Sequence, residues 1–256
     1  MTATPDDAVH VREPGRWSVR DPAAHNRGVR RMFARIARVY DLMNHLLSLD
    51  RDRAWRRRLV DRLAPGTPLV LDLCAGTGDL GLAALRRGRA RRVVAADFTP
   101  AMLRAGRRKG LGRAVPAVAA DTQRLPFRDA CADAVVVGFG VRNLADLRAG
   151  LAEMRRVLRP GGRLLVLDFF RDDPAARGPA RGKPAWVRWL LDRLLPLAGR
   201  VVARDRDAYG YLAASMDRFV TPAELAALMR EAGFTAIATE RLTLGIAHIV
   251  DGEVAT

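Results

Sequence analysis

The chain of 256 residues contains few cysteine, lysine and aromatic residues. Its two cysteines, Cys74 and Cys131, are too few for a disulfide framework, which favours a reducing, cytoplasmic compartment. Aromatic residues make up 6% of the chain and do not interleave with the basic clusters, so we expect no nucleic-acid partner. The four histidines share no metal-ligand spacing, and we therefore predict no metal site.

Long apolar runs are missing as well. No run is long enough to span a bilayer, and the N-terminal segment lacks the apolar core of a secretory signal. Arginine is abundant instead, since Lys109 and Lys183 are the only lysines in a chain of formal net charge +16. Arginine clusters at 51–62, 86–92 and 104–113 indicate either solvated helix faces, which we favour for most of the excess, or a surface for an anionic membrane.

The most informative stretch that is present is LVLDLCAGTGDLG, at residues 69–81. An apolar run meets a glycine turn and then a helix-like segment, which is typical of the first strand, loop and helix of a nucleotide-binding α/β sheet. Gly76 and Gly78 would let the backbone approach a ligand closely. Residues 76–81 also satisfy G-x-G-x-x-G, so a dinucleotide and S-adenosylmethionine are both candidate cofactors.

Acids near the predicted strand ends favour S-adenosylmethionine of these two. Asp72 and Asp79 flank the glycine loop, where two carboxylates would repel a pyrophosphate but suit a ligand with a sulfonium and an ammonium group. Asp97 ends the second apolar run and could accept both ribose hydroxyls. Asp121 and Thr122 end the third, where a carboxylate could receive an adenine amine. Any one of these acids, taken alone, could instead cap a helix or a turn.

The order of the predicted elements describes one domain with appendages. Residues 1–25 are polar and contain prolines, so we expect a flexible N-terminal tail. A single domain is expected over 26–256, with a helical cap at 26–64 and a helical lid or insert at 171–212. Between these appendages strands and helices alternate, which indicates a parallel sheet with right-handed crossovers. Two final strands are expected to form a C-terminal hairpin.

Several separated motifs resemble the ubiquinone/menaquinone biosynthesis C-methyltransferase family. The family's Y-D-x-M-N pattern is found at residues 40–44 and its F-G-x-R-N pattern at residues 139–143. Weaker matches include ADTQRLPFRD, MRRVLRPGGRLLVLDF and YGYLAASM. The resemblance implies a class I S-adenosylmethionine-dependent methyltransferase (Rossmann-like) fold, with a mostly parallel seven-stranded sheet, helices on both faces and a C-terminal β-hairpin. The chain departs from the family at Asp52, where a His is usual, and at Gly138, where a Ser often contacts the cofactor.

The resemblance implies methylation of a ring carbon of a polyprenylated quinol, with S-adenosylmethionine as the cofactor. Conversion of demethylmenaquinol to menaquinol is the favoured reaction, while a benzoquinol ring and another small phenolic or lipid-like acceptor remain alternatives. Such a substrate lies in the bilayer, so we expect peripheral contact with an anionic membrane surface from the cytoplasmic side. The amphipathic stretch 185–203 fits either an interfacial helix or a lid on the protein's own core. A homodimer is left open.

The implied reaction needs a group that favours loss of a phenol proton, since a phenolate activates the adjacent ring carbon. Arg142 is expected to stabilise the phenolate or to hold a water that takes the proton, although it could instead pair with Asp146. Tyr40, Asp41 and Asp52 are alternative proton acceptors. A further candidate is Asn143, which could equally be a helix N-cap. The residues expected to bind the cofactor are Asp72, Gly76, Thr77, Gly78, Asp97, Asp121, Thr122 and Gly138.

Overall fold

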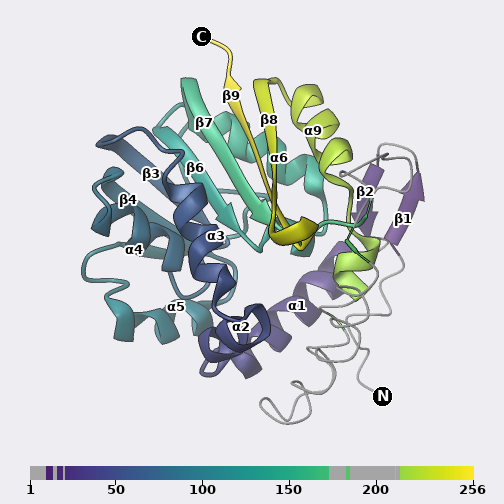
Figure 1. Cartoon of the computed structure of the whole chain (residues 1–256), viewed down its shortest axis with the longest axis horizontal. Coiled ribbons are helices and arrows are strands. Elements are labelled where there is room, and N and C mark those ends of the chain that lie inside the picture. Colours follow the sequence, from purple (N-terminus) through teal and green to yellow (C-terminus); the bar gives the residue numbers. More distant parts are fainter. Residues whose placement is uncertain (1–9, 14–15, 20, 173–182, 185–210, 212–213) are drawn as a thin grey trace.

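The computed structural model describes residues 10–13, 16–19, 21–172, 183–184, 211 and 214–256. Its centre is a seven-stranded sheet in the order β5-β4-β3-β6-β7-β9-β8 (Figure 1). Within this sheet the neighbours among β3, β4, β5, β6 and β7 pair in parallel, whereas β9 pairs antiparallel with both β7 and β8. This arrangement confirms the predicted fold class. The strands are β3 (Thr67–Leu73), β4 (Ala90–Asp97), β5 (Ala117–Ala119), β6 (Ala132–Gly138), β7 (Leu158–Asp168), β8 (Phe234–Leu242) and β9 (Ala247–Val254).

Helices cover both faces of this sheet (Figure 1). Successive valines of β6 show why both faces need cover: Val135 and Val137 pack in one apolar cluster and Val136 in the other. The first cluster includes residues of α6 and α9, and the second includes residues of α3 and α4. The principal helices are α1 (Pro22–Ile36), α2 (Tyr40–Ser48), α3 (Arg51–Val60), α4 (Asp79–Arg86), α5 (Pro100–Gly106), α6 (Leu147–Val157) and α9 (Pro222–Glu231).

The predicted cap, 26–64, consists of α1, α2 and α3. Asp21 caps the start of α1 by accepting a hydrogen bond from the Ala24 amide at 2.8 Å. Between α2 and α3 the chain turns sharply, because Leu49 and Asp50 both adopt left-handed backbone conformations, with φ of 50° and 59°. This corner is made without a glycine.

Residues 1–25, expected as a flexible tail, contain regular structure that the composition did not predict. Strands β1 (His10–Glu13) and β2 (Arg16–Val19) form a two-stranded antiparallel sheet. The Val19 amide donates a hydrogen bond to the Ala145 carbonyl at 3.1 Å, which attaches this sheet to the main domain. Most of the predicted lid, including all of 185–203, lies outside the described residues.

Some predicted boundaries were wrong. The third strand, β5, ends at Ala119, so Asp121 lies beyond it in an isolated bridge with Arg124. Strand β7 begins at Leu158 and includes the Pro-Gly-Gly segment of the MRRVLRPGGRLLVLDF motif. Among the helices of the described part of the chain, none is long and apolar enough to cross a bilayer.

Candidate active site

A cleft of about 610 Å³, partly open to solvent, lies at the carboxyl ends of the parallel strands. This is the edge at which open α/β sheets bind ligands. One wall is polar and comes from the ends of the strands, whereas the other is largely apolar and comes from α1 and α2. The lining residues include Asn26, Val29, Phe33, Tyr40, Cys74, Gly76, Asp97, Phe98, Met102, Asp121, Thr122, Gly138, Phe139, Asn143 and Leu144.

The glycine loop forms the floor of this cleft. Gly76 has a φ of 58°, and a Cβ atom there would lie 3.4 Å from the Met102 Cε and 3.9 Å from the Tyr40 ring. Gly78 has a φ of 83°, and its Cβ would lie only 2.7 Å from a Leu111 methyl. Both positions therefore favour glycine for backbone conformation, and Gly78 also for packing space. Gly78 supports the loop from behind and does not line the cleft.

Asp97 is placed as the sequence predicted, at the end of β4 and facing the cleft. One carboxylate oxygen accepts the Gly76 amide at 2.8 Å, and the other accepts the Thr99 amide at 2.7 Å. Burial raises the pKa of Asp97 above its usual range, and the two amide hydrogen bonds oppose this effect. Each oxygen keeps acceptor capacity, so the carboxylate can also receive ribose hydroxyls.

Asp121 and Thr122 also line the cleft, on the far side of Asp97 from β3. Asp121 accepts the Gln123 amide at 2.9 Å, which fixes the turn that follows β5. The Thr122 hydroxyl lies 3.4 Å from the Cys74 sulfur, so the turn and the glycine loop are in direct contact. Burial raises the pKa of the Cys74 thiol to about 12, which makes it an inert group at neutral pH.

Asp72 lies behind the glycine loop and does not line the cleft. Its side chain is 1% exposed and accepts the Gly81 amide at 2.8 Å. Burial raises its pKa to about 7, and the nearby carboxylates of Asp79 and Asp97 add to this effect. Asp72 therefore fixes the start of α4 against β3. The electrostatic role we predicted for it is weakened, because the group carries only part of a charge at neutral pH.

Asp79 also differs from the prediction, since its charge is taken up by cations of the protein. The Lys109 amine forms an ion pair with Asp79 and another with Asp41 at 2.9 Å. Arg56 lies 3.7 Å from the other Asp79 oxygen. Burial alone would raise the pKa of Asp79, but Arg56 and Lys109 outweigh it and the pKa is lowered. The acids that remain for a ligand are Asp97 and Asp121.

Thr77 joins the glycine loop to the cap. Its hydroxyl donates to Asp41 at 2.6 Å and accepts from the Lys109 amine at 2.6 Å. Thr77 is buried and does not line the cleft. Thr77 and Asp41 therefore tie α2 to the loop, and the Asp41 carboxylate is already occupied by two donors. Asp41 does not line the cleft either, so it is poorly placed to take a proton from a ligand there.

Gly138, where a serine would be expected to contact the cofactor, lies at the end of β6 on the cleft wall. A Cβ atom there would lie 2.7 Å from a Leu80 methyl. The departure from the family pattern has a packing reason, because Leu80 fills the space that a serine side chain would need. Any contact of Gly138 with a ligand is limited to its backbone.

Arg142 is buried, with 6% of its surface exposed, in a short 3₁₀ turn after β6. Its guanidinium pairs with Asp168 at 2.7 Å and donates to the Phe139 carbonyl at 2.6 Å. Burial lowers the pKa of Arg142, but Asp168 more than offsets this and holds the pKa above its ordinary value. The alternative prediction, that Arg142 pairs with Asp146, was wrong. Asp146 instead caps α6 by accepting the Ala149 amide at 3.1 Å.

One donor of Arg142 is left over. Among the described residues, its Nε–H has no hydrogen-bond partner, which is costly for a buried group. Tyr40 is close enough for its charge state to affect the pKa of Arg142. Burial in turn raises the pKa of the Tyr40 phenol, although a hydrogen bond with Asn44 and the charge of Arg142 oppose this. Tyr40 is thus a neutral hydrogen-bond donor at physiological pH and a poor base.

Asn143 lines the cleft beside Arg142 and is not the helix N-cap that we considered, since Asp146 has that position. Its amide donates to the Phe139 carbonyl at 3.3 Å, and its oxygen accepts the Tyr211 hydroxyl at 3.0 Å. Sequence reasoning did not link Asn143 with Tyr211, which is 68 residues away along the chain. The only signal was that both belong to segments resembling the same family.

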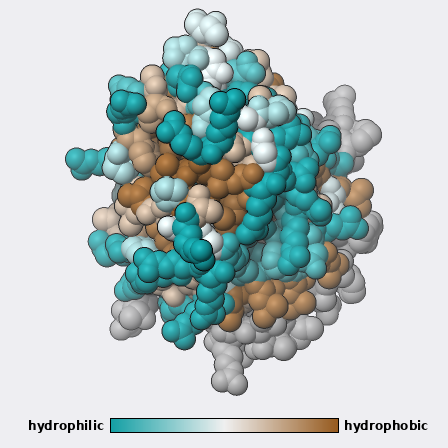
Figure 2. Space-filling view, turned by 90° about the vertical axis from the view of Figure 1, so that its left-hand side faces the viewer, coloured by the Kyte–Doolittle hydropathy of each residue, from teal (hydrophilic) through white to brown (hydrophobic). Residues whose placement is uncertain are grey.

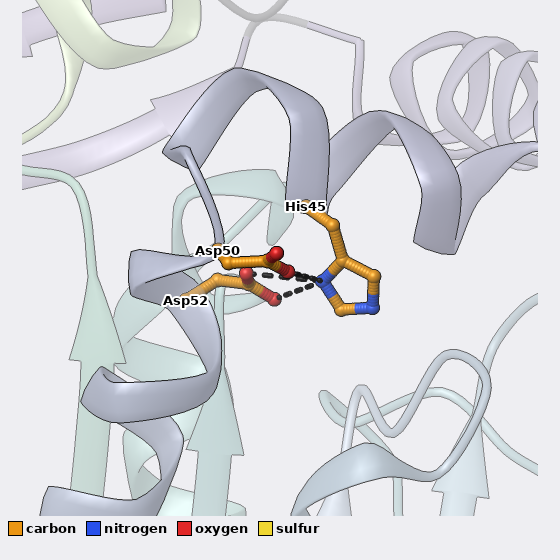
Figure 3. Close-up of side chains that lie close together, drawn as sticks. All are labelled: His45, Asp50 and Asp52. Atoms are coloured by element: carbon orange, nitrogen blue, oxygen red, sulfur yellow. Dashed lines mark hydrogen bonds and ion pairs between the residues drawn. The ribbon is translucent and has the colours of Figure 1, made fainter.

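Asp52, another predicted proton acceptor, lies in the cap away from the cleft lining. Figure 3 shows His45 reaching from α2 toward Asp50 and Asp52 at the start of α3. Asp52 accepts from the His45 ring at 3.0 Å, from Ser48 at 2.8 Å and from Arg56. Burial opposes ionisation of Asp52, but Arg56, His45 and Ser48 outweigh it and lower the pKa. Arg56 neutralises Asp52, so the cluster is explained as an ion-pair network.

The geometry fits an S-adenosylmethionine site. The cleft joins a glycine floor to the Asp97 carboxylate, which can receive ribose hydroxyls, and to Asp121 and Thr122, whose oxygens could receive an adenine amine. Fold and site together define a class I methyltransferase that uses S-adenosylmethionine.

Comparison with known proteins gives the family within this class. The model of the ubiE/COQ5 methyltransferase family matches residues 21–253, and the chain belongs to this family. It is 43% identical over 226 residues to a demethylmenaquinone methyltransferase from Thermus thermophilus, covering 87% of this chain and 99% of that relative. It is 42% identical over 233 residues to a ubiquinone/menaquinone biosynthesis C-methyltransferase from Acidiphilium cryptum, covering 88% and 89% of the two chains.

Solved structures with similar folds are more distant. A methyltransferase from Thermotoga maritima, described as a possible histamine N-methyltransferase, has a TM-score of 0.61 at 19% identity, with 88% of this chain and 98% of that chain covered. The [4+2]-cyclase SpnF has a TM-score of 0.62 at 15% identity, with 90% and 96% covered. At these identities the likeness establishes the fold alone, and the second case shows that the fold also serves other chemistry.

Proposed function

We propose that the chain methylates a ring carbon of a polyprenylated quinol, with demethylmenaquinol as the favoured acceptor. The observation that carries the proposal is the second wall of the cleft, where Tyr40 and apolar residues of α1 face the glycine loop, together with the Asn143 amide on the strand-end wall. An aromatic quinol has an apolar ring and two hydroxyls, which this wall complements. The names of the relatives from Thermus thermophilus and Acidiphilium cryptum support the same assignment.

S-adenosylmethionine, when bound, supplies an electrophilic methyl group on a sulfonium. The protein must then make a quinol carbon nucleophilic by favouring loss of a hydroxyl proton, whose unperturbed pKa is about 10. The Arg142–Asp168 pair has little net charge, so we assign its effect to the free Nε–H of Arg142. Arg142 does not line the cleft, so this group would reach the phenolate oxygen through a water. A hydrogen bond from a charged donor of this kind is worth about 1.5–3 kcal/mol.

The proton acceptor follows by elimination among the candidates. Asp52 lies in the cap, Asp41 is paired with Lys109, and the pKa of Tyr40 is raised. We therefore propose that a water on the Arg142 Nε–H takes the hydroxyl proton, with the neutral Tyr40 phenol as a second donor to the substrate oxygen. The methyl–sulfur bond would break as the ring carbon takes the methyl group, and the proton of that ring carbon would then pass to water as the ring becomes aromatic again.

The acceptor is expected to come from a bilayer, because its polyprenyl tail is insoluble in water. We accordingly propose transient, peripheral contact of the protein with an anionic membrane surface, supported by the formal net charge of +16. The homodimer considered from the sequence stays an untested prediction.

The decisive experiment gives the purified chain methyl-labelled S-adenosylmethionine and a reduced quinol in detergent. Reduced demethylmenaquinol and the corresponding benzoquinol are tested in parallel, and the product is analysed by mass spectrometry. We expect label on a ring carbon of the naphthoquinol. An Asp97→Asn variant is the control for dependence on the cofactor site. Absence of label in both quinols, with cofactor binding intact, would show that this methyltransferase acts on another acceptor.

A further inference from the structure

The outer face of α2 carries a row of exposed leucines. Leu42, Leu46 and Leu49 are 60%, 48% and 73% exposed, at a spacing of four and then three residues. On an α-helix this spacing places side chains on one face, and Leu49 continues the row at the C-cap. Met43, about a quarter of a turn around α2 from these leucines, is buried. We call Leu42, Leu46 and Leu49 the leucine row.

Leu49 occupies this position at a conformational cost. Its backbone is left-handed, with φ 50° and ψ 48°, a region that leucine rarely adopts and that glycine or asparagine adopts readily. An apolar side chain is thus presented to solvent from a strained backbone. Strain of this kind is often retained where the side chain has a function.

Arginines flank the leucine row along the chain. Among the described residues from 38 to 57, the exposed charged groups are Arg38, Asp50, Arg51, Arg53 and Arg57. The exposed charge of this stretch is therefore positive. Figure 2 shows a hydrophobic region low on the molecule with hydrophilic side chains above it. An apolar strip with a basic border is the composition that binds anionic lipid surfaces.

The position of α2 connects this surface with the cleft. Tyr40, the first residue of α2, lines the cleft, and the leucine row follows within the same helix and its C-cap. A ligand held against Tyr40 therefore lies beside the helix that carries the row. A long apolar tail leaving the cleft would reach a hydrophobic environment at once if this face rested on a bilayer.

We propose that the leucine row inserts into the surface of an anionic membrane and so holds the cleft toward the bilayer. The choice of a membrane as the binding partner rests on the proposed function, because a polyprenylated acceptor must be drawn from lipid. The apolar row and its arginine border are independent of which quinol is used. The interaction combines burial of three leucines with attraction between arginines and lipid phosphates.

The test measures co-sedimentation of the full chain with vesicles of phosphatidylcholine and phosphatidylglycerol in equal parts. The informative variant is Leu49→Asn, since asparagine tolerates the left-handed backbone and the fold should be retained. The matched control is Leu244→Asn, an exposed leucine that is also left-handed, with φ 57°, but lies in the β8–β9 connection. Leu49→Asn should lower the partition coefficient about fivefold, and adding Leu42→Ser and Leu46→Ser about a hundredfold. Leu244→Asn should bind like the wild type.

Three results would overturn the proposal. Wild-type protein that does not bind the vesicles, or row variants that bind as well as the wild type, would exclude a lipid contact here. A fall in the sedimentation coefficient of the row variants, without vesicles, would assign the face to a second copy of the chain. Faster proteolysis within 185–203 in the row variants, with vesicle binding unchanged, would show that this segment covers the row.

A quinol with a truncated, water-soluble tail separates this inference from the proposed function. Row variants should methylate the truncated quinol at the wild-type rate and lose activity only on long-tailed quinol in vesicles. Row-dependent vesicle binding with no methylation of any quinol would leave the surface standing and refute the acceptor. Methylation of quinols, together with vesicle binding that does not depend on the leucine row, would support the acceptor and refute the surface.

Discussion

The two walls of the cleft are built with different interactions. On the cofactor side, carboxylates accept hydrogen bonds from backbone amides, as Asp97 does from Gly76 and Asp72 does from Gly81. On the cap side, carboxylates are held by cationic side chains, as Asp41 is by Lys109 and Asp52 is by Arg56. The first wall is therefore fixed by the course of the backbone itself.

The cap is joined to the rest of the domain by partners that are far apart in the sequence. Lys109 and Asp41 lie far apart along the chain, and Arg56 of α3 lies 3.7 Å from Asp79 at the start of α4. Replacing such a pair changes contacts between side chains, whereas replacing a carboxylate that holds a loop amide disturbs the loop backbone itself. The variants below test this comparison.

The largest effect is expected when the buried cation Arg142 loses its partner. Asp168→Asn leaves the buried Arg142 charge uncompensated, and we expect the free energy of unfolding to fall by roughly 3–5 kcal/mol. Urea denaturation followed by circular dichroism measures this loss. A double variant, Arg142→Met with Asp168→Leu, should recover most of the stability because both charges are gone. A loss of under about 1 kcal/mol in the single variant would show that the pair is solvated.

On the cofactor side, Asp97→Asn should reduce affinity more than stability. The asparagine side chain keeps one acceptor but directs an NH₂ group at a backbone amide, which disturbs the loop and removes the charge. We expect affinity for S-adenosylmethionine to fall about a hundredfold, measured by isothermal titration calorimetry. The control is Asp133→Asn, because Asp133 also accepts a backbone amide, from Leu69 at 2.8 Å, but does not line the cleft. Equal losses of affinity for S-adenosylmethionine in the two variants would show that Asp97 has no special part in binding the cofactor.

The buried Asp72 should make the cofactor side sensitive to pH. Its pKa is about 7 in the folded protein, so the folded state keeps a proton that the unfolded state has already lost above its ordinary value of 3.8. Stability from this group is therefore present at acidic pH and lost as pH rises toward and through 7. Asp72→Asn should stabilise the protein at about pH 8 by roughly 2–3 kcal/mol more than at about pH 5. Thermal unfolding of both proteins at the two pH values measures this, and parallel curves would contradict it.

The smallest effect is expected at the link between the two walls. Lys109→Met removes the amine that joins Thr77, Asp79 and Asp41, but this side chain is 27% exposed, so screening limits the loss of stability to about 1 kcal/mol. Turnover should fall about fivefold as α2 loosens over the loop. Lys109→Arg should not restore it, because a planar guanidinium cannot replace a compact ammonium among three acceptors. Arg108→Met, an exposed neighbour, should have wild-type turnover.

The contrast between the walls also explains how much of the site could be predicted from sequence. Asp97 and Gly76 were placed correctly because apolar runs and glycine turns are local patterns that fix where a strand ends. The partner of Arg142 was not predicted, since a near neighbour such as Asp146 and a distant Asp168 are equally compatible with the sequence. Helical spacing in the cap was visible, but it could not show that α2 would leave one face uncovered.

Chemical modification of Lys109 can report on the motion of the cap. The chain has only two lysines, so an amine-selective acylating reagent meets few targets in an arginine-rich protein. While α2 rests on the glycine loop, the Lys109 amine is held by Asp41, Asp79 and Thr77 and is only 27% exposed, so an acylating reagent reaches it slowly. The acylation rate of this one residue, followed by mass spectrometry, would therefore report how often α2 separates from the glycine loop.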